Sequence, residues 1–185
     1  GLPALEQFEA LAEGKVKAIW ILCTNPAASA PDTDLIEKAL RQAELVVVQD
    51  AYHPTATSRF AHVILPAAQW SEKEGVMTNS ERRVTYMPKL AEPPGEALPD
   101  WKIISLFAYA LGFGANFMYQ SAEEIFAEFA VLTEGTLCDI SGADYARLKS
   151  HGPVQWPYPK SKPTKGARLY ENARFATADG KAAFI

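Results

Sequence analysis

Three short apolar runs, separated by segments with helical spacing, constrain the fold of this chain more than any other feature. The runs span residues 16–23, 45–48 and 62–65, and each has the length and the branched apolar content of a strand. Continuous apolar runs are expected where strands are covered on both faces, as in a parallel sheet. Residues 5–12, before the first run, and residues 34–43, between the first two runs, keep helical spacing. The pattern predicts an α/β fold with a Rossmann-like, mostly parallel sheet flanked by helices.

Local signals predict where two of the helices begin and end. Asp34 and Glu37 form an Asp-x-x-Glu capping pattern at the start of the second helix. Asp100 starts a later helix, 101–111, whose apolar residues occur on nearly every face and therefore predict deep burial. Gly112 is a plausible end for that helix.

The second half of the chain is less regular. Residues 76–87 alternate loosely, which favours an extended ribbon over another strand-helix unit. Ser121 and Glu124 form a capping box ahead of a further helix, and a short helix is predicted over 143–149. We find no internal repeat.

Prolines forbid regular structure over residues 151–164. We expect an extended segment there that lies over a neighbouring surface, with Trp156 and Tyr158 as its anchors. The predicted organisation is an α/β domain over 1–150 and an extended tail over 151–185. We expect this chain to be an excised fragment of a longer protein.

Composition excludes several classes of function. The formal net charge of -4 argues against non-specific nucleic-acid binding through phosphate neutralisation. No apolar run approaches the roughly 18 residues of a membrane span, so we expect no membrane partner. The two cysteines have no CxxC spacing, which argues against a disulfide framework and fits a reducing, cytoplasmic location.

Polar residues follow the first two predicted strands, at the sheet edge where ligands of such folds bind. Asn25 precedes Pro26 and offers both a donor and an acceptor, although a local turn explains the pair equally well. Gln49 and Asp50 follow the second strand. Asp50 could accept from ribose hydroxyls or from the N1–H and amino edge of guanine, or it could cap the next turn.

A charged stretch, residues 69–83, follows the third strand. Within it, Lys73 can supply a compact positive charge to a phosphate or to a pterin, and Gly75 would let the backbone approach closely. The alternative is a solvated, charged turn. Arg82 and Arg83 could clamp a phosphate or pair with nearby glutamates on the surface.

Other candidate residues carry no assigned chemistry. His53, His62 and His151 lack metal-ligand spacing. Cys23 ends an apolar strand and is predicted to be a small core residue, whereas Cys138 is predicted to be a free thiol in a loop. No GxGxxG motif is present to indicate a nicotinamide cofactor. We therefore assign no catalytic residue and no metal ligand.

The order of these motifs resembles one family over most of the chain, the bis-molybdopterin guanine dinucleotide oxidoreductases. It is most similar to the catalytic subunits of assimilatory nitrate reductases, and residues 152–157 resemble a segment of nitrate reductases and some formate dehydrogenases. The motifs are Cys23–Pro26, Gln49–Asp50, Leu65–Ala68, Trp70, Glu72–Gly75, Asn79–Arg83 and Asp100–Trp101.

The resemblance implies a molybdenum bis(molybdopterin guanine dinucleotide) cofactor, of which this chain would hold one guanine dinucleotide arm. The implied cofactor-binding residues are Asn25, Gln49, Asp50, Lys73 and Asp100. In the family, the iron-sulfur cysteines and the molybdenum ligand lie N-terminal to this region, and a further pterin-contacting domain follows it. The chain alone would then be inactive.

Two classes of function compete. The first is part of a molybdoenzyme that reduces nitrate to nitrite, with formate dehydrogenase as the alternative enzyme. Its partners would be the other domains of the parent enzyme and an electron donor protein or subunit. The second is a free-standing nucleotide-binding module without redox chemistry.

Overall fold

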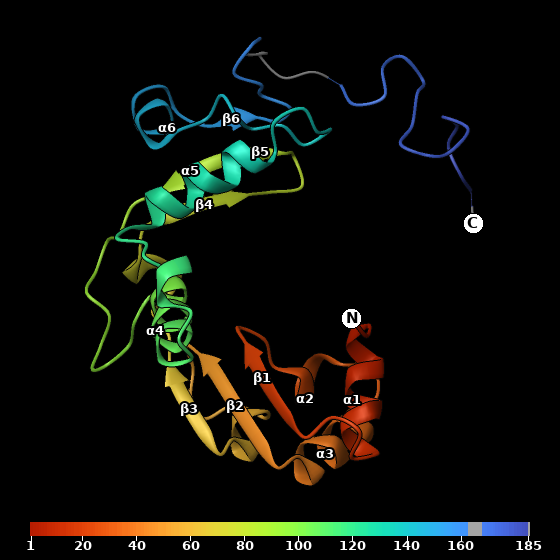
Figure 1. Cartoon of the computed structure of the whole chain (residues 1–185), viewed down its shortest axis with the longest axis vertical. Coiled ribbons are helices and arrows are strands. Elements are labelled where there is room, and N and C mark those ends of the chain that lie inside the picture. The colour runs from red at the N-terminus through yellow and green to blue at the C-terminus, as the bar shows by residue number, and fades with distance from the viewer. Residues whose placement is uncertain (163–167, 185) are drawn as a thin grey trace. The chain divides into compact units, whose positions relative to one another are not determined.

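The structure is a computed structural model that describes residues 1–162 and 168–184. The chain forms two compact units (Figure 1). The first unit comprises residues 1–73 and 89–118, and the second comprises residues 74–88 and 119–185. Each unit is therefore built from two separate segments of the chain. The boundary predicted at residue 150 falls inside the second unit.

A parallel three-stranded sheet forms the centre of the first unit, as the apolar runs predicted. Its strands are β1 (Ala18–Leu22), β2 (Leu45–Asp50) and β3 (Val63–Pro66), with β2 in the middle. Ile21 lies opposite Val48 in the register of β1 and β2. Because all strands run the same way, their carboxyl ends lie at one edge of the sheet.

Two helices cover one face of this sheet. They are α1 (Ala4–Ala12) and α3 (Thr33–Gln42), and the short α2 (Pro26–Ser29) follows β1. Apolar side chains of α1 and α3 interdigitate with those of β1 and β2, which removes them from water and stabilises the layer. This first core comprises Phe8, Leu11, Ile21, Ala27, Ile36, Ala39, Leu40, Ala43, Val46 and Val48.

The helix α3 begins earlier than the capping pattern predicted. Asp32, not Asp34, is the N-cap residue, and its Oδ1 accepts a hydrogen bond of 2.9 Å from the backbone N–H of Leu35. Both aspartates are good cap residues, so local sequence alone does not choose between them. Asp34 instead lies in the first turn, where its negative charge interacts favourably with the helix dipole.

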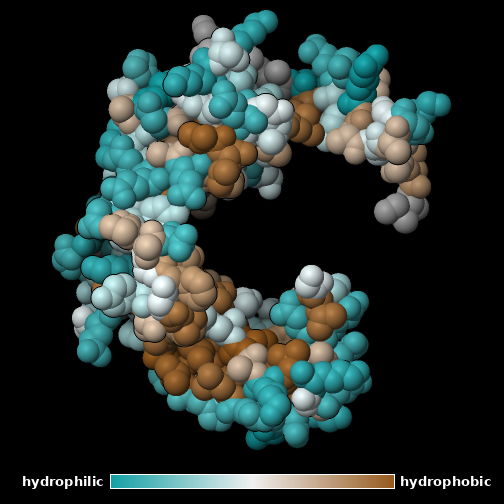
Figure 2. Space-filling model, in the orientation of Figure 1, coloured by the Kyte–Doolittle hydropathy of each residue, from teal (hydrophilic) through white to brown (hydrophobic). Residues whose placement is uncertain are grey.

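The helix α4 (Asp100–Ala110) contributes to the other face of the sheet, where Phe107 packs edge-on against Trp20 with a centroid separation of 4.8 Å. The prediction of deep burial on nearly every face of this helix is wrong. Tyr109 is 75% exposed and Leu106 is 53% exposed, because the described residues cover only part of its surface. Figure 2 shows apolar side chains gathered over the sheet and α4.

Three short 3-10 helices complete the connections of the first unit. They are η1 (Ser58–Phe60), η2 (Trp70–Glu72) and η3 (Gly114–Asn116).

The second unit is built on an antiparallel ribbon, which confirms the extended structure predicted over residues 76–87. The strands β4 (Gly75–Thr78) and β5 (Arg83–Met87) form a hairpin, and β6 (Val154–Gln155) pairs with β5. Two helices, α5 (Ala122–Leu132) and α6 (Tyr145–His151), pack with it. The core comprises Val84, Phe126, Ala130, Ile140, Ala143, Tyr145, Leu148 and Val154.

Caps define both helices of the second unit. Ser121 Oγ accepts a 3.2 Å hydrogen bond from the backbone N–H of Glu124 at the start of α5, which is one half of the predicted capping box. The Glu124 side chain accepts from the backbone N–H of Gln120 instead of from that of Ser121. The short helix predicted from residue 143 begins two residues later, because Asp144 is its N-cap and accepts from the backbone N–H of Arg147.

Part of the proline-rich segment packs on the second unit. Trp156 and Tyr158 lie against its core, which confirms them as anchors. Gly142 allows the close approach, because a Cβ there would lie 2.8 Å from the backbone oxygen of Tyr158. The segment begins later than predicted, since His151 is the last residue of α6. Residues 163 and 164 lie outside the described residues.

None of the helices in the described ranges, 1–162 and 168–184, has the length and apolar content needed to cross a membrane.

Candidate functional site

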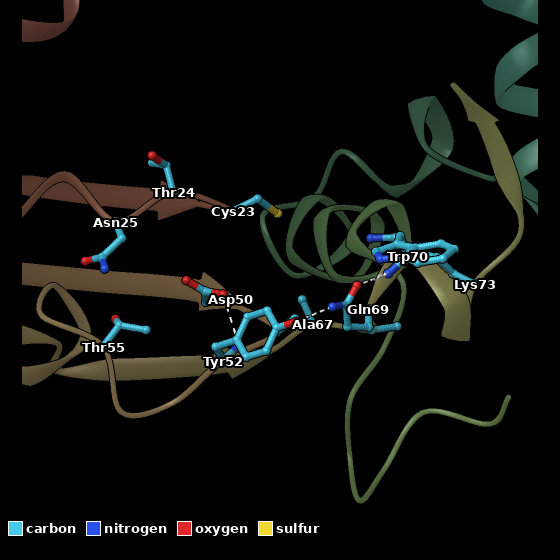
Figure 3. Close-up of a pocket in the computed structure, with 12 residues that line it drawn as sticks. Cys23, Thr24, Asn25, Asp50, Tyr52, Thr55, Ala67, Gln69, Trp70 and Lys73 are labelled. Carbon is cyan, nitrogen blue, oxygen red and sulfur yellow. Dashed lines mark hydrogen bonds between the residues drawn. The ribbon is translucent and has the colours of Figure 1, made fainter. Parts of the chain in front are cut away.

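A cavity of about 560 Å³ lies at the carboxyl ends of β1, β2 and β3 (Figure 3). Its volume falls within the range of roughly 300–1,000 Å³ that is usual for small-molecule sites. All of its lining residues belong to the first unit. They are Cys23, Thr24, Asn25, Asp50, Ala51, Tyr52, Thr55, Ala67, Ala68, Gln69, Trp70 and Lys73.

Asn25 brings an amide group to the cavity from the turn after β1. Its Oδ1 accepts hydrogen bonds from the backbone N–H of Thr57 at 3.0 Å and from Thr57 Oγ1 at 2.7 Å. Thr57 is completely buried, so these bonds fix the Asn25 side chain. The local structural role is therefore real, but within the described residues the Asn25 amide nitrogen has no hydrogen-bond partner and stays available as a donor.

Asp50 brings a carboxylate to the cavity at the end of β2. Its Oδ1 accepts a 3.0 Å hydrogen bond from the backbone N–H of Tyr52, which is the turn-capping role that the sequence left open. A carboxylate has two oxygens and about four acceptor positions. Capping the turn thus orients Asp50 and leaves its second oxygen for a ligand.

Gln49 lies behind the cavity and not on its wall. Its side chain is fully buried, and its Nε2 donates a 2.7 Å hydrogen bond to Asp100 Oδ1. Its Oε1 is buried without a hydrogen-bond partner among the described residues. The observed contact gives Gln49 a supporting role.

The start of the charged stretch forms a third wall. The backbone N–H of Gln69 donates to Glu72 Oε2 at 2.8 Å, and Gln69 Oε1 accepts from the backbone N–H of Trp70 at 2.6 Å. These bonds fix the turn η2, and Lys73 follows it directly. The charged residues here are therefore ordered, in contrast to a freely solvated turn.

Asp100 connects the walls through a polar network. Its Oδ2 pairs with Lys73 Nζ, while its Oδ1 accepts from Gln49 and from Cys23 Sγ, the latter at 3.1 Å. Burial raises the pKa of Asp100, but hydrogen bonds from Lys73, Cys23 and Gln49 and the charge of Lys73 outweigh it, so the pKa lies below its ordinary value. Asp100 thus stays ionised and holds Lys73 at the cavity.

Cys23 corrects one prediction. It was expected in the core, but it is exposed and lines the cavity. The strand β1 ends one residue earlier, and Cys23 itself has a φ of 54°, which turns the chain out of the sheet. Burial, together with the hydrogen bond and charge of Asp100, raises the pKa of its thiol to about 11. It is therefore a protonated donor at neutral pH, with little nucleophilic character.

The five residues predicted to contact a cofactor thus come together in one place. Asn25, Asp50 and Lys73 line the cavity, while Gln49 and Asp100 lie behind it and orient Lys73. Such a site offers donors to anionic oxygens and an acceptor to N–H or O–H groups.

No ligand contact was predicted for the two aromatic side chains at the rim of the cavity, although Trp70 is one of the motifs that carry the family resemblance. Tyr52 and Trp70 are 61% and 58% exposed and line the cavity. Both follow predicted strands within a few residues, and this position is a signal that could have indicated them as cavity residues. Sequence alone does not tell whether such a side chain points into a cavity.

The arginines of the charged stretch belong to the second unit. Arg82 donates to the backbone oxygen of Trp156 and lies over its ring, 5.5 Å from the centroid. Arg83 Nε lies 3.1 Å from Glu81 Oε1, which is the surface pairing considered as the alternative. Neither arginine lines the strand-end cavity.

A second cavity of about 250 Å³ lies within the second unit and is mainly apolar. Its lining includes Cys138, an exposed free thiol as predicted. The other lining residues are Val76, Thr78, Val84, Phe126, Phe129, Thr133, Ile140 and Trp156. With no charged side chain among them, this cavity offers no site for a phosphate.

The described part of the chain contains no group of three or more His, Cys, Asp or Glu residues that could hold a metal ion. His62 Nδ1 accepts a 3.0 Å hydrogen bond from the backbone N–H of Val46, so this histidine has a structural role.

Comparison with known proteins gives consistent matches. The family model described as molybdopterin oxidoreductase matches residues 1–109. A nitrate reductase of Synechocystis sp. is 45% identical over 100% of this chain and 26% of that protein. The assimilatory nitrate reductase catalytic subunit of Bacillus subtilis is 42% identical over 99% of the chain and 26% of that protein.

Formate dehydrogenases are also similar. The alpha subunit of one from Methanocaldococcus jannaschii is 40% identical over 90% of the chain and 24% of that protein. Among solved structures, acetylene hydratase from Pelobacter acetylenicus has a TM-score of 0.68 and 24% identity, covering 96% of this chain and 23% of that one, and supports the fold alone. The chain spans about a quarter of the length of the curated relatives it matches.

Proposed function

This chain belongs to the molybdopterin oxidoreductase family, and we propose that its first unit holds one guanine dinucleotide arm of a molybdenum bis(molybdopterin guanine dinucleotide) cofactor. The family implies a molybdenum–molybdopterin cofactor. The parent enzyme in our proposal is a nitrate reductase. The match to a nitrate reductase covers the whole chain, whereas the match to the formate dehydrogenase covers 90% of it, and this difference favours our choice.

The observation that carries the proposal is the convergence of Asn25, Asp50 and Lys73 on one cavity. The free oxygen of Asp50 suits the N–H edge of guanine or the hydroxyls of a ribose. Lys73 suits a phosphate, because it provides a compact positive charge. The Asn25 amide can donate to a phosphate or carbonyl oxygen. These donors and acceptors fit a nucleotide, and the cavity has the volume for one.

The chemistry of the parent enzyme would come from the cofactor, which, when bound, supplies molybdenum for oxygen-atom transfer from nitrate. The residues of this chain bind and orient. Asp100 keeps Lys73 at the cavity, Gln49 keeps Asp100 in place, and the Thr57 contacts do the same for Asn25. Electrons would come from an iron-sulfur cluster and an electron donor outside this chain.

We further propose that the enzyme is cytoplasmic and that this chain is inactive without the remaining domains. Both Cys23 and Cys138 are free thiols, which suits a reducing compartment. In the formate dehydrogenase alternative the substrate differs, but this chain would bind the cofactor in the same role. Sequencing the full reading frame tests both enzymes, since each requires cluster cysteines and further pterin-contacting domains, and the metal-ligand region would separate nitrate reductase from formate dehydrogenase.

Saturation-transfer difference NMR with GDP tests the binding role. We expect millimolar binding by the chain, lost in Asp50→Ala and kept in the control Asp34→Ala, whose carboxylate lies in the first turn of α3. Micromolar or tighter binding that Asp50→Ala abolishes would favour a free-standing nucleotide-binding module. Equal binding by the Asp50→Ala variant and the unmodified chain would contradict the proposal.

A further inference from the structure

Two aromatic side chains are exposed at the rim of the strand-end cavity. Tyr52 and Trp70, the aromatic rim, are 61% and 58% exposed, and both line the cavity. Figure 3 shows them beside Gln69, on segments that follow β2 and β3. Aromatic surface that stays exposed to water does not gain the free energy that burial of apolar surface provides. A ligand with a flat apolar face would provide that burial.

Gln69 connects the two segments of the aromatic rim. Its Nε2 donates to the hydroxyl of Tyr52, and its Oε1 accepts from the backbone N–H of Trp70 at 2.6 Å. One amide therefore contacts the Tyr52 side chain and the Trp70 backbone. Restricting the Tyr52 ring before a ligand arrives lowers the entropy cost of binding.

The rings of Tyr52 and Trp70 have no aromatic or cationic partner among the described residues. Within the described part of the chain, neither ring stacks on another ring or lies under a cation. Trp156 of the second unit differs, because Arg82 lies over its ring and its indole N–H donates to Thr78 Oγ1 at 3.2 Å. The faces of Tyr52 and Trp70 thus stay available, whereas Trp156 is used within the fold.

A carboxylate lies next to the aromatic rim. Asp50 is two residues before Tyr52, and its Oδ1 is bound to the Tyr52 backbone N–H at 3.0 Å. The site thus joins a flat apolar surface to an acceptor for N–H groups. A planar base with N–H donors on its edge matches both features. A sugar phosphate has hydroxyl donors for the carboxylate but no flat face, and pyrophosphate matches neither feature.

We propose that Tyr52 and Trp70 stack on the planar heterocycle of the ligand and so determine the preference of this site for nucleotides. This inference rests on the proposed function, since it assigns a specificity role within the same cavity. Stacking on an aromatic side chain is worth enough to shift affinity by roughly fivefold or more per base.

The test compares two probes, GDP and pyrophosphate, whose affinities for the chain are measured by NMR titration. Tyr52→Leu and Trp70→Leu should each weaken GDP binding roughly fivefold or more and leave pyrophosphate binding unchanged. Tyr52→Phe and Trp70→Phe keep a flat ring and should restore most of the GDP affinity. Tyr109→Leu is the matched control, because this tyrosine is 75% exposed on α4, away from the cavity.

The outcomes separate this inference from the proposed function. If the chain binds GDP through Asp50 and the leucine variants bind it as tightly, stacking is overturned and the nucleotide site stands. Equal weakening of GDP and pyrophosphate, without rescue by phenylalanine, would also overturn stacking and indicate a structural role. If the chain binds neither probe, both proposals fail.

Discussion

The two units use their charged and aromatic side chains in opposite ways. In the first unit, Asp50 and Lys73 reach a cavity at the strand ends. In the second, Lys149 Nζ lies 4.7 Å from the ring centroid of Tyr86 and 5.2 Å from that of Tyr145. The charged and aromatic side chains at the cavity of the first unit stay available for a ligand, whereas these side chains of the second unit stabilise the unit itself.

Sheet direction explains this difference. Parallel strands place all their carboxyl ends at one edge, so the residues that follow different strands meet there. In an antiparallel hairpin, successive strands end at opposite edges. The charged stretch over residues 69–83 is divided accordingly, with Lys73 in the first unit and Glu74, which accepts from the Tyr86 hydroxyl at 2.9 Å, in the second.

The largest expected effect is on the core that supports the cavity. Leu40 is 1% exposed beneath β2, and Leu40→Ala should lower the free energy of unfolding of the first unit by about 2–5 kcal/mol. Hydrogen exchange of the Val46 and Val48 amides measures this loss. Leu106→Ala, at a half-exposed position of α4, is the control and should cost far less. Unchanged protection in Leu40→Ala would show that this core does not hold the sheet.

The next largest effect is on the network of Asp100. Asp100→Ala leaves the buried Gln49 amide without its acceptor and should destabilise the first unit by about 1–3 kcal/mol. Urea unfolding followed by tryptophan fluorescence measures the change, with Asp34→Ala as the control. A loss no larger than that of the control would mean that the network contributes nothing.

The same carboxylate predicts a pH dependence. Because its hydrogen bonds hold the pKa of Asp100 below the ordinary value of 3.8, its contribution to stability is present above that value and is lost as the pH falls through the folded pKa. Unfolding measured from pH 6 down to about pH 2 should show this loss, and Asp100→Asn should lack it.

A smaller effect of opposite sign is expected in the second unit. Tyr145 is 1% exposed, and its hydroxyl has no hydrogen-bond partner among the described residues. Tyr145→Phe should therefore raise the stability of this unit by about 1 kcal/mol. The matched variant Tyr86→Phe removes the hydrogen bond to Glu74 and should lower it slightly. A clear loss of stability in Tyr145→Phe would reveal a partner for that hydroxyl.

The last prediction concerns the reactivity of Cys23, and we expect it to have the smallest effect on folding. The thiol of Cys23 stays protonated at neutral pH. In a Cys138→Ser background, alkylation of Cys23 should rise with a midpoint near pH 11. Asp100→Asn removes a neighbouring negative charge and should lower that midpoint. Mass spectrometry of alkylated chain measures both. A midpoint at the ordinary value of 9.0 would contradict the contact of the thiol with Asp100.

Sequence predicted the parts of the fold that depend on local pattern. The three strands follow from apolar runs, and the hairpin follows from alternation over residues 76–87. The burial of α4 did not follow, because the hydrophobicity of Leu106 and Tyr109 says nothing about which element covers them. Cys23 was misjudged since an apolar run does not mark the residue at which the strand ends.

Local pattern predicted only part of the candidate site. Asn25, Asp50 and Lys73 follow predicted strands, so a parallel sheet brings them together. Family resemblance predicted Asp100 as a cofactor-binding residue, but its pairing with Lys73, 27 residues earlier in the chain, was not predicted. The rim formed by Tyr52 and Trp70 depends on the Gln69 amide contacts, which no local pattern encodes.

The most direct test of the account is an amide chemical-shift map of the isotope-labelled chain titrated with GDP. We predict that the shifts concentrate at residues 23–25, 50–52 and 69–73 of the first unit, and that the amides of β4, β5 and α6 stay unchanged. Shifts confined to the second unit, or spread evenly over both, would contradict the claim that the strand-end cavity is the nucleotide site.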